Sequence, residues 1–171
     1  MGAYKVLYNN IHDTLSGSTM LKTVEDFNAQ YQNQEINNIN KYPACYVEAN
    51  NVYWDKNNVS CYSLAQPPQN GRATIRLHVV HHTLKAHNKA SKNELFDLAD
   101  HVTSLVHRLQ AIDNENGNYT TLLRVQEQYI TPNKQLNIAI ITFETQLNDL
   151  FPVAPYNLTT GVTYTLSTDY I

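Results

Sequence analysis

The sequence predicts an α+β domain in which an antiparallel sheet is packed by two amphipathic helices, with an extended C-terminal arm. Three observations predict it: an apolar stripe at helical spacing over residues 91–112, apolar–polar alternation over 72–84, and two strand-like runs joined by a turn at 131–134. We expect the domain to span residues 1–148 and the arm residues 149–171. The length of 171 residues suits one such domain.

The N-terminal segment predicts the first helix, over residues 3–16. Its apolar residues recur at helical spacing, and Gly17 stands where a C-terminal cap belongs. These apolar residues are Tyr4, Leu7, Tyr8, Ile11 and Leu15. Residues 21–27 alternate weakly and are a candidate strand. Residues 28–41 are dense in Asn and Gln and predict a loop or a weak helix.

The middle of the chain predicts strands. Residues 44–49 follow Pro43 and place Cys45 and Val47 on one face, with Tyr46 and Glu48 on the other. Residues 52–54 predict a short partner strand. Residues 64–71 contain two prolines and an Asn-Gly pair, which predict a loop or turn. In residues 72–84 apolar side chains alternate with Arg, Thr and His, as in an antiparallel strand with one solvated face.

The second helix is predicted over Ser91–Ile112. Ser91 and Glu94 have the spacing of a capping box, in which the two side chains satisfy each other's backbone N–H groups. The apolar residues that follow fall on one stripe, as expected of a helix lying on a sheet. They are Leu95, Leu98, Ala99, Val102, Leu105, Val106, Leu109 and Ile112.

The last part of the domain predicts a hairpin. A polar turn over 114–118 leads to strands over 119–130 and 135–147, which the turn Thr131–Lys134 should join as antiparallel neighbours. From residue 149 onward the chain has almost no charge and is rich in Thr and Tyr. This segment predicts an extended arm or a strand added to a neighbouring subunit.

Composition argues against several classes of function. The net charge is −3, and the 12 Lys and Arg residues are scattered, so the basic stripe of a nucleic-acid-binding protein is missing. No apolar run approaches the ~20 residues of a membrane helix, and residues 1–10 do not resemble a signal peptide. We therefore expect a cytosolic origin and no membrane partner. Only 16% of residues are charged, which suits surfaces that contact other proteins.

Residues that could carry chemistry are sparse. The histidines His78, His81, His82 and His87 come nearest to a metal set, and His78 and His82 share a strand face. A metal site needs three or four converging ligands, usually oriented by a carboxylate, and no such motif accompanies them. We interpret them as polar strand and loop residues and expect no metal.

The other candidates for catalysis are equally isolated. Glu48, Glu127 and Glu144 lie on predicted strands and could form an acid–base pair, but single solvated carboxylates are the more common case. Cys45 and Cys61 lack a nucleophile signature and should be small buried hydrophobes in a reducing compartment. The five glycines are not clustered, which excludes a phosphate-binding loop. We expect no catalytic residue, no cofactor and no enzymatic activity.

Tyrosine is the residue in excess, with 12 copies against 4 Phe and 1 Trp. Tyr gives a large contact area with a polar tip, which is why it is enriched at interfaces. Tyr156, Tyr164 and Tyr170 lie in the uncharged arm, where a core cannot explain them. We expect these three residues to contact another chain.

The order of the predicted elements resembles the phage tail-terminator family of tail-completion (gpU-like) neck proteins. The resemblance covers residues 3–148. It is carried by three segments, Tyr42–Glu48, Ile75–Val80 and Glu94–Asp100, together with Leu122-Leu123-Arg124 and the strand over 138–147. The Asn-rich residues 28–41 and the arm depart from the family pattern, which leaves the position within the neck open.

The resemblance implies a structural virion protein that is assembled in the host cytoplasm. Members of such a family form a homo-oligomeric ring, here a hexamer, that caps the tail tube and faces the head connector. Its partners would be copies of itself, the tail tube and connector proteins, with DNA only passing through the lumen. The resemblance implies no catalysis and no cofactor. Two alternatives stay open: a head-closure or adaptor protein of the head–tail joint, including a similar ring in a short-tailed virion, and a host-directed protein-binding module.

Overall fold

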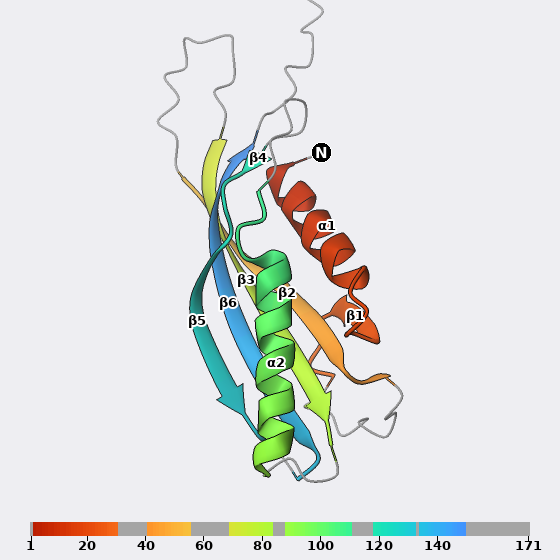
Figure 1. Ribbon diagram of the computed structural model, residues 1–171. Helices are drawn as coiled ribbons and strands as arrows, with labels where there is room; N and C mark the ends of the chain where they lie inside the picture. The colour runs from red at the N-terminus through yellow and green to blue at the C-terminus, as the bar shows by residue number, and fades with distance from the viewer. Residues whose placement is uncertain are drawn as a thin grey trace, which may run out of the picture.

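The computed structural model describes residues 2–30, 41–55, 69–83, 88–110, 118–132 and 134–149. Two helices lie on one face of a six-stranded sheet, which confirms the predicted α+β class (Figure 1). The elements in chain order are α1 (Ala3–Ser16), β1 (Thr23–Asp26), β2 (Ala44–Trp54), β3 (Gln69–His82), α2 (Lys89–Val106), β4 (Asn118–Tyr119), β5 (Leu123–Ile130) and β6 (Leu136–Asp149).

The sheet is mixed, whereas the sequence predicted an antiparallel one. Its order is β1-β2-β3-β6, and both β4 and β5 pair with the outer edge of β6. All pairs are antiparallel except β1 with β2, where Thr23 stands opposite Ala44 and Asp26 opposite Val47. Because β1 and β2 run in the same direction, the chain must return from the end of β1 to the start of β2 between the two strands.

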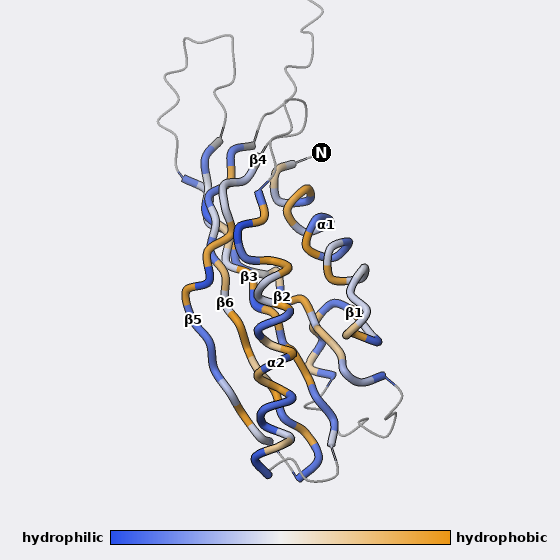
Figure 2. The backbone as a smooth tube through the Cα atoms, in the orientation of Figure 1, coloured by the Kyte–Doolittle hydropathy of each residue, from blue (hydrophilic) through white to orange (hydrophobic). Residues whose placement is uncertain are grey.

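The main core fills the space between the helices and the sheet. Helix α1 buries Ala3, Leu7, Ile11 and Leu15 completely, and the last three belong to its predicted stripe, whose tyrosines are only partly buried. The alternation predicted for β3 is also confirmed, and it is visible as changing colour along the strands in Figure 2. Its buried face consists of Ala73, Ile75, Leu77 and Val79, and the same side of β2 contributes Cys45 and Val47. Burial raises the pKa of the Cys45 thiol to about 12, so this cysteine is a buried apolar residue, as predicted.

A second, smaller apolar cluster lies on the opposite face of the sheet. Its buried members are Tyr42, Ala44, Tyr46, Val80, Leu136 and Ile138. The strand register places these residues on the face away from the helices, because each alternates with a residue of the main core. The rest of this face carries many polar side chains, and apolar residues such as Tyr53 and Leu123 are exposed there. Only one end of the helix-free face is therefore apolar and buried.

Three predicted boundaries in the sheet were wrong. Residues 52–54 are the continuation of β2 past a register shift between Glu48 and Asn51, and not a partner strand. Gln69–Gly71 belong to β3, because they pair with Leu147–Asp149, so the Asn-Gly pair marks no turn. The predicted strand over 119–130 is divided into β4 and β5, since Thr120–Leu122 leave the sheet. The hairpin between β5 and β6 is confirmed.

Helix α2 differs from its prediction at both ends. It begins at Lys89, two residues before the predicted start, and the Asn88 side chain accepts a hydrogen bond from the Ser91 N–H at 2.8 Å. The capping box is thus wrong. The helix ends at Val106, because Arg108 adopts a left-handed conformation with φ 71°. Leu95, Leu98, Ala99, Val102 and Val106 are buried, which confirms most of the predicted stripe.

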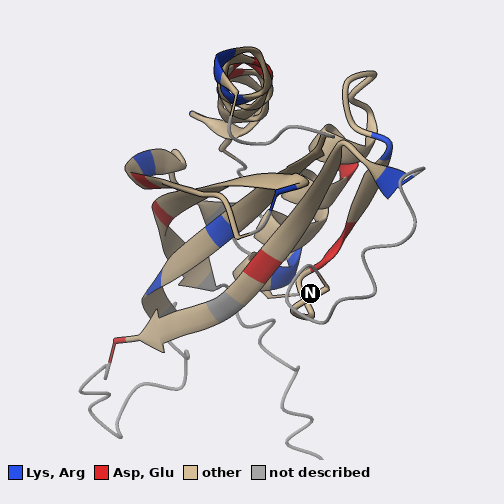
Figure 3. Cartoon of the chain, turned by 90° about the horizontal axis from the view of Figure 1, so that it is seen from below, with Lys and Arg blue, Asp and Glu red and all other residues tan. Residues whose placement is uncertain are grey.

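Several predictions fall outside the described residues. These are the loop or weak helix over most of 28–41, the turn over 64–68, Ile112, the turn over 114–117 and the arm beyond Asp149, together with Cys61 and His87. Among the described residues, neither helix is both long and apolar enough to cross a membrane. In Figure 3, acidic and basic positions are scattered over helices and strands, and the described residues form no basic stripe.

Candidate subunit-contact surface

Strand β5 forms one edge of the sheet and carries an unusual amount of exposed apolar surface. Within the described residues β6 is its only strand partner. The side chains of Leu123, Val125 and Tyr129 are 53%, 51% and 43% exposed. A strand edge of eight residues presents backbone N–H and C=O groups that another strand can pair with, and such edges are usually covered or charged in monomers. This edge is therefore a candidate contact surface.

The chain before β5 is held firmly, so the position of the edge is fixed. Leu122 is fully buried. Its carbonyl oxygen accepts from the Arg108 N–H at 2.9 Å, and its own N–H donates to the Leu109 carbonyl at 2.9 Å. These two bonds tie the start of β5 to the segment that follows α2. The early end of α2 thus has a structural role, because it brings Arg108 and Leu109 alongside Leu122.

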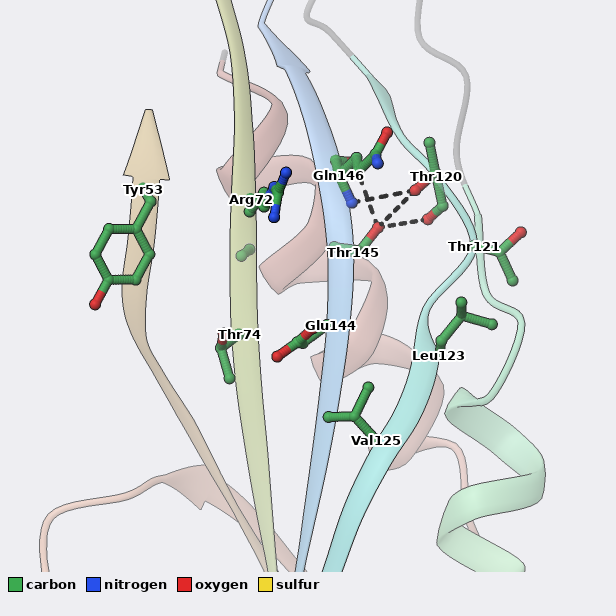
Figure 4. Close-up of a pocket in the computed structure, with 11 residues that line it drawn as sticks. Tyr53, Arg72, Thr74, Thr120, Thr121, Leu123, Val125, Glu144, Thr145 and Gln146 are labelled. Carbon is green, nitrogen blue, oxygen red and sulfur yellow. Dashed lines mark hydrogen bonds between the residues drawn. The ribbon is translucent and has the colours of Figure 1, made fainter. Parts of the chain in front are cut away.

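A bulge in β5 lies next to two exposed apolar side chains. The register with β6 shifts between Arg124 and Gln126, which makes Val125 an extra residue in β5. Leu123 stands opposite Glu144, on the helix-free face of the sheet. Val125 lines the same hollow as Leu123, as Figure 4 shows. The extra residue shifts the alternation after it, so that Gln126 stands opposite Thr142 and Glu127 stands opposite Ile141 on the helix side.

The hollow beside this edge, here called the β5 groove, has a volume of about 700 Å³. Side chains of four strands surround it on the helix-free face, and Figure 4 shows Tyr53 and Arg72 on one side and Leu123 and Val125 on the other. Its lining comprises Tyr53, Arg72, Ala73, Thr74, Thr120, Thr121, Leu123, Val125, Glu144, Thr145 and Gln146. The groove mixes apolar, hydroxyl and charged groups, which is the composition of a protein interface rather than of an apolar ligand pocket.

Hydrogen bonds hold the upper wall of the groove. Thr145 Oγ1 donates to the Thr120 carbonyl at 2.7 Å, and the Gln146 N–H donates to Thr120 Oγ1 at 3.1 Å. The Thr120 N–H donates in turn to the Gln146 carbonyl at 2.9 Å. Residues 120–122 therefore stay attached to β6 although they lie between two strands. The groove is preformed in the single chain.

The opposite edge of the sheet is a poorer contact surface. Strand β1 has only four residues, and two of them are acidic. Glu25 pairs with Lys41 at 3.9 Å, and Asp26 accepts a hydrogen bond from the Tyr8 hydroxyl, which raises the pKa of Tyr8 to about 12. A short, charged edge discourages the addition of another strand. The two edges of the sheet thus differ in length and polarity.

The predicted candidate residue His78 belongs to a buried polar pair on the helix-free face. Its Nε2 atom lies 2.9 Å from Glu48 Oε2, and its ring stacks on Phe27 with a centroid distance of 4.0 Å. Arg76 approaches the same carboxylate at 3.7 Å. Burial lowers the pKa of His78, and the charge of Glu48 partly counteracts this effect. One neutral His bound to one carboxylate serves to satisfy buried polar groups.

The predicted candidates His81 and His82 lie apart, as do His101 and His107 on and next to α2. His81 approaches Glu94 at 3.5 Å, and burial lowers its pKa. His82 stacks on Tyr42, His101 contacts Ser18 Oγ at 2.9 Å, and His107 Nδ1 faces the Arg124 N–H at 3.4 Å. Among the described residues, no group of three His, Cys, Asp or Glu side chains could hold a metal ion.

The three strand carboxylates do not meet either. Glu48 stands opposite Arg76 on β3, whereas Glu144 on β6 lines the β5 groove. Glu127 stands opposite Ile141, a residue of the main core, so it lies on the helix side of the sheet. There it accepts hydrogen bonds from Arg124 and from the Tyr129 hydroxyl. The possible acid–base pair is therefore not formed by these residues.

Sequence reasoning missed the exposed residues of β5 and the groove. The segment 122–125 was noted only for the resemblance, although its run of Leu-Leu-Arg-Val breaks the alternation expected of a half-buried strand. That break lies at Leu122 and Leu123, where β5 begins, just before the bulge. Tyr156, Tyr164 and Tyr170 lie outside the described residues, so their role as contact residues stays a prediction.

Comparisons with known proteins give structural likenesses but no match in sequence. No protein-family model matches the chain, and no curated protein matches it in sequence. Among solved structures, the chain is similar to a chain described as "Virion of native gene transfer agent (GTA) particle", with a TM-score of 0.46 and 9% sequence identity. The match covers 86% of this chain and 95% of that chain. A likeness at this level identifies neither family nor function.

Proposed function

We propose that this protein is a structural virion subunit that associates with copies of itself through the β5 edge. The observation that carries the proposal is the combination of exposed Leu123, Val125 and Tyr129 with an open strand edge and a preformed groove. Apolar groups concentrated along one edge are stabilised when another protein covers them. Among the described candidates for catalysis, Glu48, His78, His81 and Glu127 each contact a structural partner, which favours an assembly role over an enzymatic one.

The finer assignment rests on the resemblance of the element order to tail terminators. In this assignment, the subunits form a hexameric ring at the head-proximal end of the tail and join the tail to the head connector. The unlike edges of the sheet support a ring, because a contact between two different surfaces repeats head to tail and can close on itself. The low content of charged residues, 16%, and the net charge of −3 suit a lumen through which DNA passes without binding.

Native mass spectrometry of the full chain, combined with metal analysis and electron microscopy, tests this proposal. We expect a metal-free oligomer that grows with protein concentration and appears as rings. Replacement of Met20, an apolar residue 42% exposed on the turn after α1, with Lys should leave the oligomer unchanged. A monomer at all concentrations, or a monomer loaded with a transition metal, would rule out the assembly role.

A further inference from the structure

The C-terminal arm has the sequence pattern of a strand, and this pattern suggests what covers the β5 edge. From residue 156 to residue 170, apolar and polar positions alternate with period two. The even positions carry Tyr156, Leu158, Thr160, Val162, Tyr164, Leu166, Thr168 and Tyr170, and the odd positions carry Asn157, Thr159, Gly161, Thr163, Thr165, Ser167 and Asp169. All three arm tyrosines thus share one apolar face. Val, Thr and Tyr are also the residues that favour strands.

We propose that the arm of one subunit adds as a strand to the β5 edge of a neighbouring copy, with its apolar face over Leu123 and Val125 and its tyrosines toward the β5 groove. The inference rests on the proposed self-assembly and names the segment that makes the contact. Strand addition satisfies the outward backbone groups of an edge, and alternate side chains then fill the adjacent hollow. In β5, about every second residue directs its backbone N–H and C=O groups away from β6, where an added strand can pair with them.

The chemistry of the two surfaces agrees. Residues 150–168 of the arm carry no charged side chain, so nothing in this segment repels Arg72 or Glu144 in the groove. A tyrosine ring can cover Leu123 and Val125 while its hydroxyl reaches the Thr, Gln or charged groups around them. The polar face of the arm, in which Thr is the commonest residue, would meet solvent. The short acidic β1 edge offers no comparable match.

We take the occupant to be a second copy because the described part of one chain leaves this surface open. Leu123, Val125 and Tyr129 stay about half exposed within one subunit. Residues 150–157 can span up to about 27 Å when extended, which is several times the strand spacing of about 4.8 Å. The arm can therefore leave its own sheet at Asp149 and reach a neighbour. Each subunit then donates one arm and accepts another, as a closed ring requires.

Complementation between two full-length variants tests the inference. The edge variant, Leu123→Lys with Val125→Lys, keeps its arm but cannot accept one. The arm variant, Val162→Lys with Leu166→Lys, keeps its edge but cannot donate. Both edge positions are exposed, so the variant should fold, which circular dichroism and a thermal melt would verify. The matched control for the arm is Thr163→Lys with Thr165→Lys on the polar face.

We expect each contact variant alone to be monomeric, with self-association weakened at least about ten-fold. A mixture of the two variants should give a 1:1 heterodimer and nothing larger, because only one functional contact exists in it. The polar-face control should assemble like the natural chain. Native mass spectrometry or sedimentation of the mixture measures all three.

The outcomes separate this inference from the proposed function. If the natural chain forms rings and the arm variant forms them too, the arm is not the contact and only the inference fails. If the edge variant is monomeric while the arm variant still dimerises, two β5 edges pair with each other, which also overturns it. If the natural chain never associates and the mixture yields no heterodimer, both proposals fail together.

Discussion

Ser91 on α2 and Asn137 on β6 form a buried hydrogen bond across the main interface between helix and sheet, with Asn137 Nδ2 donating to Ser91 Oγ at 3.0 Å. The two residues are 3% and 1% exposed. Asn137 Oδ1 in turn accepts from Thr131 Oγ1 at 2.9 Å, at the turn before β6. The serine that seemed to cap the helix therefore joins the helix to the sheet, and Asn88 caps instead.

This relationship predicts that Ser91→Ala destabilises the fold more than Glu94→Ala. The first change leaves a buried amide without its acceptor and should lower the free energy of unfolding by about 1–3 kcal/mol. Glu94 is 62% exposed and only approaches His81, so its removal should cost less than about 1 kcal/mol. Urea unfolding followed by circular dichroism measures both. A larger loss of stability for Glu94→Ala than for Ser91→Ala would support the predicted capping box.

Gly71 is predicted to be intolerant of any side chain. It is paired with Trp54, and an added Cβ would lie 2.6 Å from the Trp54 ring and 2.8 Å from the Tyr53 carbonyl oxygen. Gly71→Ala should therefore cost about 1–3 kcal/mol through forced movement of the ring or the backbone. Gly17→Ala is the matched control, because its nearest neighbours lie at 3.6 and 3.7 Å, and its effect should stay within about 1 kcal/mol. Equal losses at both glycines would contradict this packing.

Stability is expected to fall as the pH drops below about 6.5. Burial lowers the pKa of His78 and of His81 in the folded state, whereas the unfolded chain takes up protons near the ordinary value of 6.5. The unfolded state then binds more protons, so stability is present above this pH and is lost as the pH falls through the folded pKa values. His78→Gln, which can still donate to Glu48, should reduce the slope. Urea midpoints between pH 5 and 7.5 measure it, and an unchanged slope would exclude His78 as its source.

Phe96 and Tyr129 are predicted to couple α2 to the outer edge of the sheet. Their rings meet edge to face, with centroids 4.7 Å apart and planes at 83°. A double-mutant cycle with Phe96→Leu and Tyr129→Leu should give a coupling free energy of about 0.5–1.5 kcal/mol. Tyr129→Phe removes only the hydroxyl that contacts Glu127 and should preserve the coupling. Additive effects in the cycle would mean that the contact does not hold β5.

The fold was largely predictable because apolar residues recur in the sequence with the spacing at which a helix or a strand buries one face. The stripe of α1 and the alternation of β3 each follow from one buried face. The end of α2 was not predictable in this way, because Leu109 packs on the core from outside the helix and continues the apolar spacing. The spacing of apolar residues indicates which positions are buried, whereas the backbone conformation of Arg108 determines where the helix ends.

The contact surface was harder to predict than the fold, for a different reason. Whether Leu123 and Val125 are buried depends on which strand lies at the edge of the sheet, and that order is set by contacts between distant segments. A local window of sequence contains no such information. The interface prediction for the arm tyrosines needed only composition, and it stays a prediction.

The central position of β6 has a consequence for how the protein is made. Residues Leu136–Asp149 are the last of the described strands to be synthesised, yet they pair with β3 along their whole length and with β4 and β5 on the other side. Until the ribosome has released them, β3 has one open edge and β5 has no partner at all. Sheet formation is then a late event that joins distant segments, which makes folding slow. Pulsed hydrogen exchange would detect it as simultaneous protection of the amides of β3 and β6.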